Sequence, residues 1–201
     1  MVRIVKVPEV VGLLISWIVI SICFSVAYLF SDLSLFPLAF LLAAGSAGVG
    51  FLLHELAHRT VARRYGCYAV YQLWIWGLVL ALAMAILTQG QLIFAALGAV
   101  YITPMAISPY VDTNTMKRVY GLISLAGPSM NLLLVVIFFF LYLQNGIVGD
   151  LGYIGMQINL WLAAFNLIPI PPFDGSKIFS WSKIVWAIFT IPAWLLLFFV
   201  L

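Results

Sequence analysis

The chain has 201 residues, of which 66% are hydrophobic and 7% are charged. Ordinary soluble domains are about 25% charged, so this composition excludes a water-soluble globular protein as well as an intrinsically disordered one. The two cysteines are too few for a disulfide scaffold. Because a membrane-spanning helix uses about 20 apolar residues, we interpret residues 1–201 as a single transmembrane domain of a small polytopic membrane protein.

Runs without charged residues locate the predicted membrane spans. In chain order they cover residues 10–31, 33–53, 65–111, 119–149, 151–173 and 184–201. Residues 72–108 of the long third run form a hydrophobic hairpin that either spans the membrane or re-enters it. Backbone that crosses lipid must be helical or part of a closed barrel, and these runs lack the alternation of barrel strands. We therefore predict an all-α fold, a polytopic membrane helical bundle of about six spans: five firm spans plus the hairpin.

The positive charges predict an orientation. When the spans are threaded alternately, all nine Lys and Arg residues fall on one side, and the opposite loops hold only Asp32 and Asp150. The positive-inside rule assigns that side, with the N-terminus, to the cytoplasm. The sequence therefore predicts a multi-pass protein of the cell membrane, and its net charge of +3 needs no nucleic-acid partner. The first run resembles a signal peptide, but it is longer than the usual apolar core of about 7–15 residues, so we interpret it as a retained span.

The two histidines of the chain occur together, as His54-Glu-Leu-Ala-His58. Residues four apart share one face of a helix, so both imidazoles can bind one metal ion. Glu55 lies beside the first of them, where its carboxylate can take a proton from water. The alternative is a pair of hydrogen-bonded core histidines or a helix-surface motif. Ionisable side chains are costly in lipid and are functional there by default, so the spacing favours a metal site.

A tetrahedral catalytic zinc site needs a third protein ligand, and the chain has no third histidine. A cysteine or a carboxylate must supply it. Asp174 stands out because it follows the run 151–173, on the same side as the histidines, and comes after three prolines. Irregular backbone at that depth is tolerated only around a cavity. The alternative is that Asp174 caps a helix over residues 176–184, since Asp is common at the N-cap position.

Taken together, these motifs resemble the site-2 proteases, the intramembrane zinc metalloproteases. The resemblance rests on the histidine motif and on the segment Asn166-Leu-Ile-Pro-Ile-Pro-Pro-Phe-Asp174-Gly. Gly127-Pro-Ser-Met-Asn131 is similar to a third signature of that family. The similarity extends over roughly residues 36–180. No PDZ or CBS domain is visible, and the hairpin occupies a stretch that varies among relatives.

This resemblance implies a function and a role for each motif residue. It implies regulated intramembrane proteolysis, in which a peptide bond is hydrolysed within or near the transmembrane segment of a membrane-protein substrate. His54, His58 and Asp174 would bind one Zn²⁺ ion. Glu55 would be the catalytic base, and Asn166 would help to hold the substrate or its developing oxyanion. Asn131 would lie near the substrate path. The expected partners are the transmembrane substrate and the lipid bilayer, and the sequence does not indicate an oligomeric state.

A metal permease is the alternative from a different functional class. It would use the two histidines, Glu55 and Asp174 as a transit site. However, it does not require a glutamate beside a histidine, and it should offer polar residues along a path to the outer face, which these apolar runs lack. A haem site is less favoured, because histidines four residues apart on one helix cannot bind opposite faces of one haem.

Three further features concern packing and substrate binding. Small residues at positions 43–50 predict close approach of a neighbouring helix to the helix that carries the histidines. Asn159 is seven residues before Asn166, and we expect it to form an interhelical hydrogen bond rather than to act in catalysis. Residues 68–74 predict a strand-like edge, which could help to hold an unwound substrate.

Overall fold

The computed structural model describes residues 7–104 and 112–199. Within them the elements in chain order are α1 (Glu9–Ser25), α2 (Ala27–Ser31), α3 (Phe36–Arg64), β1 (Cys67–Leu73), α4 (Ile75–Leu87), β2 (Gly98–Pro104), α5 (Thr113–Tyr142), α6 (Ile147–Asn166), α7 (Asp174–Trp181) and α8 (Lys183–Phe199). Arg3 and Lys6, which contribute to the predicted orientation, lie outside the described residues, as do residues 105–108 of the predicted hairpin.

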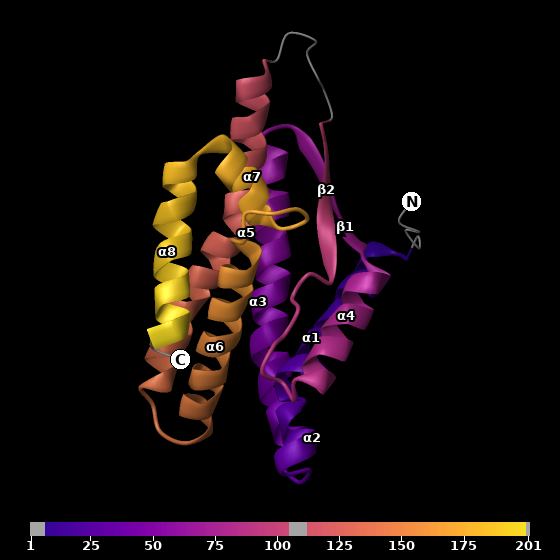
Figure 1. Ribbon diagram of the computed structural model, residues 1–201, viewed down its shortest axis with the longest axis vertical. Helices are drawn as coiled ribbons and strands as arrows, with labels where there is room; N and C mark the ends of the chain where they lie inside the picture. Colours follow the sequence, from indigo (N-terminus) through magenta and orange to yellow (C-terminus); the bar gives the residue numbers. More distant parts are fainter. Residues whose placement is uncertain (1–6, 105–111, 200–201) are drawn as a thin grey trace.

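Helices α3, α5 and α6 pack side by side and form the centre of the molecule (Figure 1). Helices α7 and α8 lie against α5 and α6 on one flank, whereas α1, α4 and the strands lie on the other. One buried apolar cluster joins α1, α3, α4 and α6, and another joins α5, α6, α7 and α8. Because α6 contributes to both clusters, its position relative to α3 and α5 is fixed from two sides.

Two helices among the described residues are long and apolar enough to cross a membrane. Helix α3 has 29 residues and α5 has 30, and their most apolar stretches have mean hydropathies of 2.0 and 2.1. Helices α1 and α8 are apolar but only 17 residues long, and α4 has 13. The prediction of about six spans is therefore wrong, and length and composition support two candidate spans.

The charge-free runs overestimate the spans because they do not show where a helix breaks. The run 10–31 divides after Ser25 into α1 and the short α2. The run 65–111 contains a strand on either side of α4, and the run 184–201 yields only α8. A run without charged residues can contain breaks between helices, whereas a membrane span needs about 20 residues of continuous helix.

The fold is mainly helical, but the two strands form an antiparallel sheet, so the all-α prediction is wrong for this part of the chain. Every second residue of β1, from Cys67 to Leu73, is buried, as expected for a strand with one face against the core. Cys67 pairs with Pro104 at one end of the sheet and Leu73 with Gly98 at the other. The strand-like edge predicted at residues 68–74 corresponds to β1, which begins and ends one residue earlier.

Glu9 connects three elements near the metal-binding motif. Its side chain forms an ion pair with Arg59 of α3 and accepts a hydrogen bond from the backbone N–H of Tyr71 in β1 (3.0 Å). The side chains of Arg59 and Glu9 are 28% and 25% exposed. The first turn of α1 is therefore fastened both to the sheet and to the part of α3 that directly follows His58.

Small residues allow neighbouring helices to approach α3 closely, as the sequence predicts. A methyl group built on Gly48 would lie 2.5 Å from Nε1 of Trp17, whose N–H donates to the carbonyl oxygen of Ala44 (2.8 Å). A methyl group on Gly50 would overlap the side chain of Asn159 in α6. Close packing of α1 and α6 therefore holds in place the helix that carries the histidines.

Candidate metal centre

His54 and His58 lie on α3 with their imidazole rings on the same face. Their Nε2 atoms are 2.9 Å apart, and the two residues are 5% and 4% exposed. Oδ2 of Asp174 lies 3.4 Å from Nε2 of His54 and 3.0 Å from Nε2 of His58. The three side chains, which the sequence predicts as ligands, therefore form a possible metal site.

A break between two helices brings Asp174 to the histidines. Helix α6 ends at Asn166, and the proline-rich segment that follows turns the chain so that Asp174 is the first residue of α7. The turn is tight: a side chain at Gly175 would overlap the carbonyl oxygen of Leu167. The N-cap of α7 is Phe173, and no side-chain hydrogen bond caps this helix. The alternative role of Asp174 as a helix cap is therefore not supported.

Hydrogen bonds on the far side of the rings orient both histidines. Nδ1 of His58 lies 2.7 Å from the carbonyl oxygen of Ile123, and Nδ1 of His54 lies 2.6 Å from Oδ1 of Asn131. Because a carbonyl oxygen can only accept, each Nδ1 carries a proton. In a neutral ring, Nε2 then presents its lone pair toward Asp174, which is the arrangement that a metal-binding histidine requires.

Glu55 and Asn166 line a cavity of about 30 Å³ together with the three metal-site residues. Oε2 of Glu55 is buried and has no hydrogen-bond partner among the described residues. Nδ2 of Asn166 donates to the backbone carbonyl of Leu162 (2.9 Å), and its second N–H has no acceptor in the part of the chain that the structure describes. Asn131 differs, because it is fully buried behind His54 and does not line this cavity. The structure thus brings five of the six predicted site residues around one space.

Helix α5 leaves room in front of the two histidines. A methyl group built on Gly127 would lie 2.5 Å from Nε2 of His54 and would overlap Nε2 of His58. Ile123, Gly127 and Asn131 follow one another at intervals of four residues, so one face of α5 supplies both hydrogen-bond acceptors and the space between them. The sequence shows Gly127 only as part of a signature. The four-residue spacing is the signal from which its role could have been inferred.

The donor set fits a zinc ion. Two imidazole nitrogens and one carboxylate oxygen match a catalytic zinc site that keeps one position open. Burial alone would raise the pKa of the Asp174 carboxyl. When the imidazoles of His58 and His54 are protonated at Nε2 as well, their charge and hydrogen bonds, with the charge of Lys177, outweigh burial and lower that pKa below its usual value. Asp174 is therefore ionised, which is the form that binds a metal. Glu55, whose Oε2 has no hydrogen-bond partner among the described residues, lines the same small cavity as these three donors.

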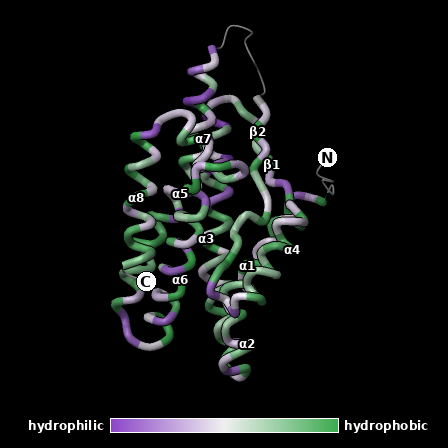
Figure 2. Tube along the Cα trace, in the orientation of Figure 1, coloured by the Kyte–Doolittle hydropathy of each residue, from purple (hydrophilic) through white to green (hydrophobic). Residues whose placement is uncertain are grey.

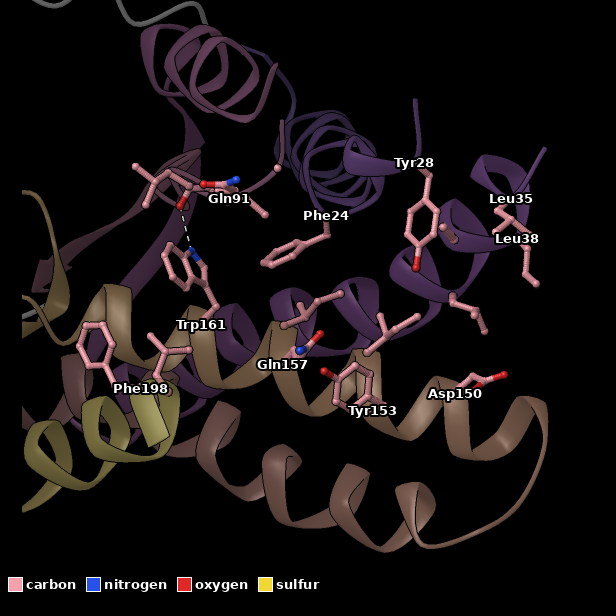
Figure 3. A pocket seen from close by; sticks show the side chains of 18 of the residues that line it. Phe24, Tyr28, Leu35, Leu38, Gln91, Asp150, Tyr153, Gln157, Trp161 and Phe198 are labelled. Carbon is pink, nitrogen blue, oxygen red and sulfur yellow. Dashed lines mark hydrogen bonds between the residues drawn. The ribbon is translucent and has the colours of Figure 1, made fainter. Parts of the chain in front are cut away.

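A much larger cavity, of about 820 Å³, lies toward the other end of α3 (Figure 3). It is bounded by α1, α2 and the start of α3, and by α6 and the end of α8. Trp161 lines this cavity and stacks on Phe165, which in turn contacts Phe173 in the wall of the small cavity. Aromatic rings therefore lie between the two spaces. The larger cavity is not the candidate metal centre, because the zinc donors line the small cavity.

Two known proteins are similar to this chain. It is 39% identical over 171 residues to the "Putative zinc metalloprotease MJ0611" of Methanocaldococcus jannaschii, a match that covers 84% of each chain. It is 31% identical over 143 residues to the "Putative zinc metalloprotease YwhC" of Bacillus subtilis, which covers 65% of this chain and 64% of that relative. No family model matches the chain, and no solved structure matches it.

The similarity to the Methanocaldococcus jannaschii protein extends over most of both chains, which is enough to establish a family relationship. The second relative carries the same description, and both names specify zinc. The buried donor set of two histidines and one aspartate agrees with that metal. The chain therefore belongs to this family of zinc metalloproteases.

Proposed function

We propose that the protein is an intramembrane zinc metalloprotease of the site-2 type, which hydrolyses a peptide bond within or near the transmembrane segment of a membrane protein. The observation that carries this proposal is the position of the histidines on α3, a helix long and apolar enough to cross a membrane. At 1.5 Å per residue, His54 lies about 15 Å from the end of α3 at Arg64. Since the hydrocarbon core is about 30 Å thick, the site would lie at the depth of the lipid.

Glu55 is the proposed catalytic base. His54, His58 and Asp174 would hold a zinc ion, which would supply polarisation of the scissile carbonyl and a pKa of water lowered toward about 7. Glu55 accepts a proton at Oε2 from the attacking water, whose oxygen bonds to the scissile carbonyl carbon. It later delivers that proton to the leaving amine as the C–N bond breaks. This proposal explains why a buried carboxylate oxygen faces the metal site without a hydrogen-bond donor of its own among the described residues.

Asn166 is the proposed stabiliser of the negative charge that develops on the scissile carbonyl. Its side chain lines the metal-site cavity, and within residues 7–104 and 112–199 only one hydrogen bond uses its amide N–H groups, to the carbonyl of Leu162. A donor placed in this way contributes roughly 2.7–4 kcal/mol in other acyl-transfer sites. Because Asn166 is the last residue of α6, the break in the helix exposes it to the cavity.

The outer edge of β2 is the proposed place for an unwound substrate. Within the described residues, β2 pairs with β1 along one edge only. Residues 98–100 of β2 line the metal-site cavity with Glu55 and Asp174, and a groove of about 350 Å³ continues along β2 past Tyr101 and Tyr120. A peptide bond in a helix is shielded by its own hydrogen bonds, so the substrate must unwind before cleavage. An extended segment can then pair with the exposed edge of the sheet.

The metal-site end of the bundle is proposed to face the cytoplasm. Arg63 and Arg64 end α3, and Lys117 and Arg118 lie near the start of α5. The end of α3 and the start of α5 lie at the same end of the molecule (Figure 1), and Figure 2 shows the start of α5 as strongly hydrophilic. Positive residues that flank membrane spans favour the cytoplasmic side.

A reporter protein with a single transmembrane segment tests this function. We expect the wild-type protein, reconstituted in lipid, to cut the reporter within or near that segment. Glu55→Gln should bind as much zinc as the wild type, because all three ligands remain, but its cleavage should fall by a factor of about 10²–10⁴. Bound zinc is measured by elemental analysis on the same samples, and the cut position by mass spectrometry.

Glu9→Gln is the matched control, because Glu9 and Glu55 are the two glutamates of the chain and Glu9 lies outside the metal centre. It should cut the reporter at the wild-type rate. Cleavage by Glu55→Gln would contradict the proposed base. Cleavage of a soluble peptide of the same sequence, without cleavage of the reporter, would contradict intramembrane proteolysis. Zinc transport into proteoliposomes, without cleavage of either substrate, would favour a permease.

A further inference from the structure

Three buried polar side chains from three helices form a chain of hydrogen bonds that ends at the metal centre. Oδ1 of Asn131 in α5 lies 2.6 Å from Nδ1 of His54 in α3. Nδ2 of Asn131 donates to Oδ1 of Asn159 in α6 (3.0 Å), and Nδ2 of Asn159 donates to the carbonyl of Gly155 (2.8 Å). Asn131 and Asn159 are both 0% exposed, so these hydrogen bonds are closed to bulk water.

The available donors and acceptors determine how the amide groups of Asn159 and Asn131 are oriented in this row of hydrogen bonds. The carbonyl of Gly155 requires the NH₂ group of Asn159, so Oδ1 of Asn159 faces Asn131 and requires an NH₂ group in turn. Oδ1 of Asn131 is thereby directed at His54, and an oxygen acceptor there requires a proton on Nδ1. If the Asn131 amide were reversed, its oxygen would face two other acceptors. The lone pair of a neutral His54 ring is therefore at Nε2, toward the metal.

Gly50 of α3 supports the same orientation of the Asn131 amide. Its carbonyl oxygen accepts a second hydrogen bond from Nδ2 of Asn131 (3.2 Å), so both N–H groups of that amide are used. A methyl group at Gly50 would overlap Oδ1 of Asn159. A glycine one turn before His54 therefore supplies an acceptor and leaves space for the asparagine pair.

The two histidines are held in different ways. Nδ1 of His58 faces the backbone carbonyl of Ile123, an acceptor that persists whatever the side chain at position 123. Nδ1 of His54 depends instead on the side chain of Asn131, and that side chain depends on Asn159. Substitutions in the asparagine pair should therefore affect one zinc ligand and leave the other as an internal reference.

We propose that Asn131 and Asn159 are positioning residues that fix the tautomer and the ring orientation of His54, and thereby set the affinity of the site for zinc. Asn159 acts through Asn131. This inference rests on the zinc site of the proposed function, but not on the substrate or on the place of cleavage. Hydrogen-bond partners of metal-binding histidines change metal affinity by about 10–100-fold when they are replaced.

Histidine NMR tests the tautomer directly. Because the chain has two histidines, labelling with ¹⁵N-histidine gives one set of ring signals for each. In the zinc-free wild-type protein at a pH at which the rings are neutral, both should show a protonated Nδ1. In Asn131→Leu the His54 signals should change to those of a mixture of tautomers, whereas the His58 signals should not. Unchanged His54 signals would overturn the proposal.

Zinc affinity, measured by competition with a chelator, tests the consequence. Asn131→Leu and Asn159→Leu should each raise the Kd for zinc by about 10–100-fold. Asn131→Asp should raise the Kd less than Asn131→Leu, because one carboxylate oxygen still accepts from Nδ1 of His54, although the other faces the carbonyl of Gly50 and Oδ1 of Asn159. The double variant should bind no more weakly than Asn131→Leu, since Asn159 acts through Asn131. Asn145→Leu, in the exposed connection between α5 and α6, is the control and should not change the Kd.

A purely structural role predicts a different pattern. It would lower the thermal stability of the zinc-free protein and leave the zinc Kd of the folded protein unchanged, and this result would overturn the proposal. Additive effects in the double variant would overturn the dependence of Asn159 on Asn131. If leucine at position 131 prevents folding, Asn131→Ala carries the same expectation. None of these measurements uses peptide cleavage, so a failed protease assay would not bear on them.

Discussion

Gly127 illustrates how a residue without a side chain can control a metal site. A methyl group at this position would occupy the space in front of Nε2 of both histidines. We therefore predict that Gly127→Ala loses bound zinc and cleavage while the protein stays folded, because alanine favours a helix interior by about 1 kcal/mol over glycine. Zinc per chain, measured by elemental analysis, checks this. Gly45→Ala is the control, because its methyl group would lie an ordinary 3.8 Å from Cδ1 of Leu151. Full zinc content in Gly127→Ala would contradict the prediction.

Asn166 should affect catalysis without affecting the metal. Its amide lines the cavity but is not among the three ligand side chains. Asn166→Ala should lower kcat by a factor of about 10²–10³ with an unchanged zinc content, as removal of one oxyanion donor does elsewhere. Steady-state cleavage of the reporter measures this effect, and Asn145→Ala is the control. A loss of zinc in Asn166→Ala would show that the residue supports the metal centre instead.

At the scale of single residues, spacing predicts the zinc donors but not their surroundings. The i, i+4 pair of His54 and His58 determines a shared face wherever the helix lies, and three prolines mark Asp174 as an unusual helix start. The partner of each Nδ1 lies on α5, and nothing in the local sequence of α3 specifies it. The position of Asn131 behind the ring, away from the small cavity, depends on how α5 packs against α3.

Among the elements, the junction of α1 with α3 and β1 depends on Glu9. Glu9→Ala removes the ion pair with Arg59 and the hydrogen bond from the N–H of Tyr71. We expect a loss of about 1–2 kcal/mol in stability, since a hydrogen bond to a charged group contributes roughly 1.5–3 kcal/mol and partial exposure weakens the ion pair. Thermal unfolding in detergent measures it. Glu9→Gln keeps an acceptor for Tyr71 and should lose less. Equal stability of Glu9→Ala and the wild type would show that the junction does not stabilise the fold.

The strands show why element type was only partly predictable. Residues of β1 alternate between buried and more exposed positions, which is a strand pattern, and the sequence indicates a strand-like edge there. Residues 98–104 belong to a long apolar run, and periodicity alone cannot distinguish a short buried strand from part of a helix. Pairing with β1 makes these residues a strand, because it supplies backbone groups of β2 with the hydrogen-bond partners that a helix would otherwise provide.

For the whole molecule, the composition indicates an apolar chain but not how that chain is divided into helices. The high apolar content agrees with two helices that are long and apolar enough to cross a membrane. The number of spans could not be predicted, because segments such as α1 and α8 are as apolar as a span but stop at 17 residues. The lengths of helices in a bundle depend on where turns and prolines fall and on what each helix packs against.

The zinc site links α3 to α7, which are far apart in the sequence, so metal binding should stabilise the whole fold. A ligand that binds only the folded state stabilises it by about 2.7 kcal/mol at a hundred times its Kd. A chelator should therefore lower the Tm of the wild type and of Glu55→Gln equally, because both keep three ligands. Asp174→Ala should show little chelator effect, since two histidines from one helix no longer join α3 to α7. Asp150→Ala, a control at the start of α6, should respond like the wild type. An undiminished chelator effect in Asp174→Ala would remove Asp174 from the zinc site, whatever the cleavage assay shows.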